Sequence, residues 1–247
     1  MQTATRIRTA VARVSLLRDA LQDHPALAQA LREIKRFQSN RFAGTYRDLL
    51  DAGPYAPATR FFLTELYSDK DYAERDRQFA RIAGAIEKFF PAQVAGTAVA
   101  LAELHALTEE LDQAMALAWL SQVDERLGDA ARYLRAWREV DRRADRESQL
   151  TTVLGIGDEM VRLTRLPGLR TMLKMMRGPA NAAGLASLQH FLETGFDTFA
   201  SMTRGPAGAQ AFLSTIRQRE AALIAMLFDD EPVACETRLA ATLGQAP

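Results

Sequence analysis

The sequence predicts an all-α protein, built as a single helical-bundle-like domain of about eight to ten helices over residues 1–247. Apolar residues recur three and four positions apart through most of the chain, which is the period of a helix with one buried face. No run alternates apolar and polar residues between hairpin turns, as an exposed-face strand would. Glycine and proline pairs divide the helical segments, for example at Gly53-Pro54 and Gly178-Pro179.

The first two predicted helices meet at His24-Pro25, where proline begins the second one. The first has a regular apolar stripe: Ile7, Val11, Val14, Leu17 and Leu21. The stripe of the second starts with Leu27, Leu31 and Ile34 and continues through Gln38, Arg41 and Thr45. Its inner face therefore becomes polar, and we expect Arg41 to be buried.

Residues 61–76 are the most distinctive stretch, in which an aromatic helix end leads through an acidic turn into a charged helix. Glu65 lies between Phe61 and Phe62 on the helical arc, so its carboxylate needs a partner there. Two interpretations are open: Glu65 pairs with an arginine, or it is a ligand or acid–base group.

The segment Phe61–Tyr67 reads FFLTELY and resembles the signature of the bacterial family named for its FFLEELY motif, with Thr64 where the motif has Glu. Residues 104–109 and 191–196 are also similar to segments of that family, so the resemblance covers most of the chain. It implies a bacterial protein of one self-contained type. It implies no catalytic residues, because the family has no assigned activity.

A long predicted helix, from about Ala92 to Val123, places His105 and Asp112 on its apolar arc and Glu109 on the flank. Spacings of four and seven residues let such side chains converge on one metal ion or proton-transfer site. The candidate internal polar cluster is Glu65, His105, Asp112, Arg41 and Glu109. Any metal would be held by His105, Asp112 and Glu65, but no Glu-x-x-His pair supports one, and we predict no cofactor. The competing interpretation is a core histidine that hydrogen-bonds Asp112 or Glu65.

The second half of the chain begins with a segment of alternating charges, in which we expect Trp119 and Trp137 to anchor the core and a sub-boundary near residues 141–150. After Pro167, basic residues lie beside a Leu/Met stripe. Arg170, Lys174 and Arg177 are thus a candidate surface for a partner or an anionic membrane, with solvated charges as the alternative. The last clear helix, residues 209–228, is predicted to expose Glu220, and the tail 229–247 to be partly ordered.

Composition limits the function classes. The chain has 31 basic and 31 acidic residues, so no overall field attracts nucleic acid or an anionic membrane. One cysteine, Cys235, permits no internal disulfide and fits a reducing compartment. We see no signal peptide and no apolar run long enough for a transmembrane helix, and expect a cytoplasmic protein.

Two functions remain open at this stage. The first is a non-enzymatic helical binding or scaffold protein that self-associates or binds a protein partner. The alternative is a helical ligand- or metal-binding sensor or enzyme that uses the buried Glu/His/Asp cluster. The packing of the Glu/His/Asp cluster distinguishes the two hypotheses. Side chains that pair with one another in a filled core are structural, whereas side chains around a cavity are available to a ligand.

Overall fold

The computed structural model describes residues 2–51, 53–65, 72–122, 127–204 and 208–244. These residues form helices and connecting turns, with no strand among them, so the all-α prediction is confirmed for this part of the chain. The ten longer helices are α1 (Gln2–Gln22), α2 (Pro25–Thr45), α4 (Ala56–Glu65), α5 (Ala73–Phe89), α6 (Ala92–Ser121), α7 (Asp129–Val140), α8 (Arg143–Leu163), α11 (Ala186–Arg204), α12 (Gly208–Asp229) and α13 (Pro232–Gly244).

The described helices exceed the eight to ten predicted because of three short ones. These are α3 (Arg47–Asp51), α9 (Leu169–Met175) and α10 (Arg177–Ala182). Gly168 and Gly184 have positive φ angles of 79° and 68°, and they break the chain before α9 and after α10. Such turns are local backbone events that the apolar period does not reveal.

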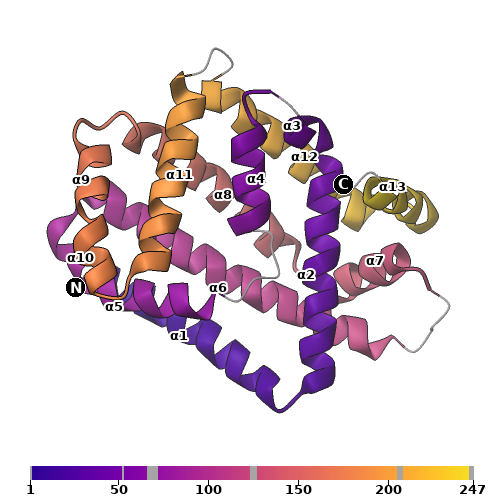
Figure 1. Cartoon of the computed structure of the whole chain (residues 1–247). Coiled ribbons are helices and arrows are strands. Elements are labelled where there is room, and N and C mark those ends of the chain that lie inside the picture. Colours follow the sequence, from indigo (N-terminus) through magenta and orange to yellow (C-terminus); the bar gives the residue numbers. More distant parts are fainter. Residues whose placement is uncertain (1, 52, 66–71, 123–126, 205–207, 245–247) are drawn as a thin grey trace.

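Helix α6 runs through the middle of the molecule, and α1 lies alongside it (Figure 1). The two helices are parallel, because contacts advance in the same direction along both. Arg6 pairs with Glu103 at 2.8 Å, Arg13 pairs with Glu110, and Gln113 reaches the carbonyl oxygen of Leu17. Helices α2, α5, α7 and α8 also contact α6, which is therefore the support for the other long helices.

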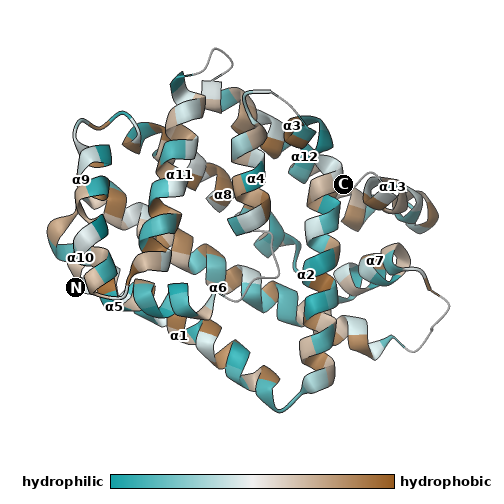
Figure 2. Cartoon of the chain, in the orientation of Figure 1, coloured by the Kyte–Doolittle hydropathy of each residue, from teal (hydrophilic) through white to brown (hydrophobic). Residues whose placement is uncertain are grey.

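Two apolar clusters form the core. The first joins α1, α4, α5, the first half of α6, α11 and the start of α12. The second joins α2, the second half of α6, α7, the end of α12 and α13. Leu150 of α8 packs against both clusters, although it lies at the predicted sub-boundary. Figure 2 shows the apolar stripes alternating with hydrophilic residues along these helices.

Most of the tail expected to be only partly ordered forms helix α13, which corrects that expectation. Cys235 and Leu239, four residues apart, are buried in the second apolar cluster, and this burial holds the helix. The helix crosses α2 at Gly44, where an added Cβ atom would lie 1.9 Å from the carbonyl oxygen of Thr242. Glycine thus permits a backbone contact that any side chain would block.

Within the described ranges, none of the helices combines the length and the apolar character needed to cross a lipid bilayer.

Candidate functional site: a polar cavity between the apolar clusters

A cavity of about 180 Å³ lies in the interior of the helical assembly. Its lining includes Phe62 and Phe191 of the first apolar cluster and Tyr133 and Trp137 of the second. The ionisable lining residues are Lys35, Arg41, Glu65, Arg75, Asp76, His105, Glu109, Asp112, Arg146 and Glu220, besides the tyrosines. We call this set the polar layer, because its members line a cavity that both apolar clusters also line.

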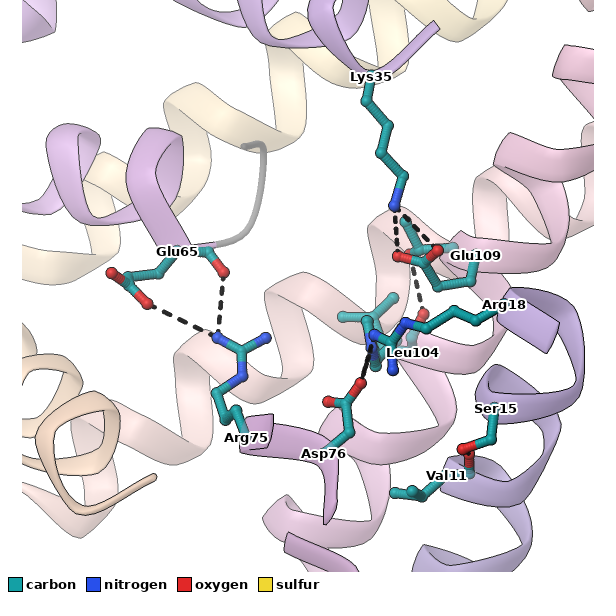
Figure 3. Close-up of polar contacts among 11 residues, drawn as sticks. Val11, Ser15, Arg18, Lys35, Glu65, Arg75, Asp76, Leu104 and Glu109 are labelled. Atoms are coloured by element: carbon teal, nitrogen blue, oxygen red, sulfur yellow. Dashed lines mark hydrogen bonds and ion pairs between the residues drawn. The ribbon is translucent and has the colours of Figure 1, made fainter. Parts of the chain in front are cut away.

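Helices α4 and α5 line one part of the cavity with partly buried side chains. A Glu65 carboxylate oxygen lies 3.6 Å from Nη1 of Arg75 (Figure 3). The Arg75 guanidinium also lies 3.9 Å from the ring centroid of Tyr72 and 4.6 Å from that of Phe191. Burial lowers the pKa of Arg75, although nearby acids oppose this. Of the two interpretations of Glu65, pairing with an arginine is the one seen here.

Asp76, on α5, lies at the centre of the next contact. Its Oδ2 accepts hydrogen bonds from Arg18 at 2.6 Å and contacts Nε2 of His105 at 3.1 Å. Figure 3 shows Arg18 reaching Asp76 from α1. Burial alone would raise the pKa of Asp76, but His105 and Arg18 outweigh it, and the pKa lies below its usual value. The expected partners of His105, Asp112 or Glu65, were therefore wrong.

Two further ion pairs fix α2 to its neighbours. Nζ of Lys35 donates to both carboxylate oxygens of Glu109 on α6, at 2.7 and 2.9 Å (Figure 3). Arg41 is buried, and its Nη1 donates to Oε1 of Glu220 at 2.6 Å. The Tyr46 hydroxyl donates to the same oxygen at 2.8 Å. The polar residues that continue the stripe of α2 therefore meet acids from α6 and α12.

Asp112 has no cation among its hydrogen-bond partners in the described residues. It is 2% exposed, and its Oδ1 accepts from Nε2 of Gln38 at 2.9 Å. Burial raises the pKa of Asp112 above its ordinary value, and Glu109 adds to this effect, while Lys35 and Arg146 oppose it. Burial therefore makes the charged form of this acid less favourable than that of an exposed aspartate.

Helices α7 and α8 line another part of the cavity. Nη1 of Arg146 donates to Oε1 of Gln149 at 3.1 Å, and the guanidinium lies 4.3 Å from the ring centroid of Trp137. Nε2 of Gln149 in turn donates to Thr108 at 2.8 Å. Trp137 is 6% exposed, and its indole N–H is buried without a hydrogen-bond partner among the described residues. A buried donor in that state is costly unless something else accepts from it.

All five members of the predicted internal cluster line this cavity: Glu65, His105, Asp112, Arg41 and Glu109. They do not form one constellation, because each has a different main partner. In the described part of the chain, no three His, Cys, Asp or Glu side chains gather closely enough to hold a metal ion. The hypothetical ligand set of His105, Asp112 and Glu65 is therefore not assembled.

Five charged residues of the polar layer are absent from the predicted internal cluster: Lys35, Arg75, Asp76, Arg146 and Glu220. Asp76, Arg146 and Glu220 are all buried. Each continues an apolar stripe at helical spacing, as Glu220 does between Ile216 and Ile224. The signal was available: a charged residue that interrupts a stripe on several helices indicates a shared polar layer.

The candidate surface on α9 and α10 has acidic neighbours that the local sequence does not contain. Nε of Arg170 donates to Asp197 at 2.8 Å, and Arg177 pairs with Glu193. Both acids lie on α11. Hydrogen bonding from Arg177 lowers the pKa of Glu193 to about 2, with Lys174 contributing. The basic residues therefore belong to a mixed-charge edge, which gives an anionic membrane little to attract.

The described residues define an all-helical protein with a charged interior cavity. The chain belongs to a family described as a domain of unknown function (DUF8198), whose model matches residues 17–234. No curated protein and no solved structure matches the chain.

Proposed function

We propose that this protein binds a small molecule in the interior cavity, as a ligand sensor or as an enzyme. The observation that carries the proposal is a cavity of about 180 Å³ whose lining combines aliphatic and aromatic residues with ten ionisable ones other than the tyrosines. A filled core of satisfied ion pairs would support a structural role for the same residues. The cavity favours the ligand-binding alternative over the scaffold.

The cost of the polar layer supports the same conclusion. Moving charges out of water costs several kcal/mol per ion, and pairing often does no more than offset this. Four ion pairs and one buried acid surround this cavity. Apolar residues at these places would give a comparable or more stable core. The presence of charged residues around the cavity, despite this cost, is explained if they bind a polar ligand.

Native mass spectrometry of the protein purified from its host tests the proposal, with metal analysis and an absorption spectrum of the same sample. We expect one small molecule per chain, released on denaturation and lost in a Trp137→Phe variant. Trp119→Phe is the matched control, since Trp119 is also buried but does not line the cavity. A protein that is free of small molecules when isolated from its host, and stays so with host metabolite extract, would refute ligand binding.

Self-association is a second candidate, favoured by apolar side chains on the surface of α6. Leu117 and Leu120, three residues apart, are 55% and 44% exposed. Side chains at this spacing share one face of a helix. Sedimentation of the wild type and of a Leu117→Glu, Leu120→Glu variant tests this: a dimer that the variant abolishes supports it, and a monomeric wild type excludes it.

The matched family and the family named for its FFLEELY motif are, we infer, the same. The likeness of residues 61–67 supports this, although Leu66 and Tyr67 lie outside the described residues. A cytoplasmic location stays a prediction from cysteine usage.

A further inference from the structure

We propose that the ligand is a small neutral molecule with an apolar body and a hydroxyl group, and that this hydroxyl donates a hydrogen bond to Nδ1 of His105. This inference rests on the proposed function and names the chemistry of the ligand and the residue that recognises it.

His105 presents an open ring nitrogen at the cavity. The residue lines the cavity from α6, and its side chain is 20% exposed. Its Nε2 lies 3.1 Å from Oδ2 of Asp76. Nδ1 makes no hydrogen bond with the described residues, and it is not one of their buried unpaired atoms. This second nitrogen is therefore accessible to a small molecule.

Asp76 determines which ring nitrogen of His105 carries the proton. Oδ2 of Asp76 also accepts a hydrogen bond from the Arg18 guanidinium at 2.6 Å, as an ionised carboxylate does (Figure 3). Such a carboxylate can only accept, so Nε2 of His105 must be the donor. In the neutral imidazole, the lone pair is then on Nδ1, which accepts. The group that binds there has to supply the hydrogen.

The charges next to His105 already have partners, which favours a neutral ligand. Asp76, which contacts His105, pairs with Arg18. Glu109, one helical turn further along α6, accepts from Nζ of Lys35 at 2.7 and 2.9 Å (Figure 3). A charged ligand group beside these pairs would be removed from water without a counter-charge of its own, and a hydroxyl avoids that cost.

The remaining lining sets the body of the ligand. More than half of the lining residues are aliphatic or aromatic, and Leu101, one turn before His105 on α6, is one of them. The volume of about 180 Å³ is slightly larger than the ~150 Å³ of a cavity known to accommodate one benzene molecule. One ring or a short alkyl chain with a hydroxyl therefore fits the space and its two kinds of surface.

The first test is the tautomer of His105. The chain has three histidines, of which His24 and His190 are exposed, so an ¹⁵N-labelled sample gives three imidazole signals that single His→Phe variants assign. At pH 8 we expect His105 to carry its proton on Nε2 and none on Nδ1. A proton on Nδ1 would overturn the inference. Asp76→Asn introduces an amide that can donate as well as accept, and it should weaken this preference.

The second test compares three probes of similar size: benzyl alcohol, its isomer anisole, and benzylamine. Anisole has the same atoms as benzyl alcohol but no O–H, and benzylamine is a cation at pH 8. We expect calorimetry to show benzyl alcohol binding about tenfold more tightly than either. His105→Phe should lower the affinity for benzyl alcohol to about that for anisole. His190→Phe is the matched control and should leave it unchanged, because His190 is exposed and does not line the cavity.

Anisole or benzylamine binding as tightly as benzyl alcohol would overturn the hydroxyl donor and leave the proposed function intact. Unchanged binding of benzyl alcohol to His105→Phe would do the same. If that variant does not fold, Asp76→Asn replaces it, and the preference for benzyl alcohol over anisole should fall. If no probe binds, the molecule in the host-purified protein decides: a neutral hydroxyl compound supports the inference, any other compound overturns it, and the absence of a molecule overturns both proposals.

Discussion

The polar layer and the α9–α11 edge are built from the same kinds of ion pair but in opposite surroundings. At the edge, the side chains of Arg170 and its partner Asp197 are 48% and 45% exposed. In the polar layer, the side chains of Arg41 and Glu220 are 8% and 11% exposed. Water replaces a lost partner at the edge but not in the interior. The comparison teaches that burial, more than the number of ion pairs, decides how much stability is lost when one partner of a pair is removed.

The largest expected effect comes from removing one partner of the most buried pair. Arg41→Leu leaves the Glu220 carboxylate buried without its cation, and we expect a loss of about 3–5 kcal/mol in the free energy of unfolding. Chemical denaturation measures it. The double variant Arg41→Leu, Glu220→Leu should recover most of the loss. Equal loss in the single and double variants would show that packing, and not charge, explains the effect.

The pH dependence of two carboxylates should have opposite signs. Because burial raises the pKa of Asp112, the folded state binds a proton that the unfolded state has released above pH ~4. The free energy of unfolding therefore falls as pH rises through this interval, by up to about 1.4 kcal/mol per pH unit, and then levels off. Asp112→Asn, with Gln38 still able to donate to residue 112, should abolish this contribution. Denaturation of wild type and variant across pH 4–8 measures the difference.

Glu193 is the matched control, since its pKa of about 2 lies below that of an unfolded glutamate. Its contribution is present above pH ~4 and is lost as pH falls toward 2. Glu193→Gln should therefore lower stability at neutral pH and lose this effect in acid. The same sign for both variants would contradict the assignment of Asp112 as a buried acid.

The two tryptophans provide a smaller and closely matched test. Both are buried, and an arginine lies over each ring, at 4.0 Å from the centroid for Trp119 and 4.3 Å for Trp137. They differ in the indole N–H: that of Trp119 donates to Glu33 at 3.0 Å, whereas that of Trp137 has no partner among the described residues. In protein freed of ligand, Trp119→Phe should cost about 1 kcal/mol more than Trp137→Phe. Equal costs would indicate that the Trp137 donor is satisfied.

The smallest effect is expected at the edge. Arg170→Gln removes a pair with Asp197 in which both side chains are close to half exposed. We expect no measurable change in the Tm at high salt and little at low salt, since exposed pairs are screened. Thermal melts at both salt concentrations measure it. A loss comparable with that of Arg41→Leu would remove the distinction between the two regions.

The sequence was most informative where the helical period is regular. The period of α1 and the start of α2 predicted those helices and the burial of Arg41. It indicated a helix after Pro167 but not the break at Gly184 that separates α10 from α11, because a glycine turn of positive φ leaves no mark on an apolar stripe.

The cavity itself could not be predicted, although five of its lining residues were. Periodicity assigns a residue to one face of its own helix. It gives no information on which other helices pack against that face. His105 was expected to contact Asp112 or Glu65, yet its partner Asp76 comes from α5, 29 residues earlier in the chain. For the same reason the local sequence could not show the acidic partners of Arg170 and Arg177, which lie on another helix.

The position of the polar layer has a consequence for cooperativity. Apolar contacts have no preferred direction, whereas a hydrogen-bonded pair holds only near one separation. The ion pairs of the layer therefore set the separation of the helices that they join, which come from both apolar clusters. A molecule bound in the cavity would contact residues of both clusters and should make their unfolding more cooperative. Backbone amides of α4 and of α13 would then exchange with the same free energy.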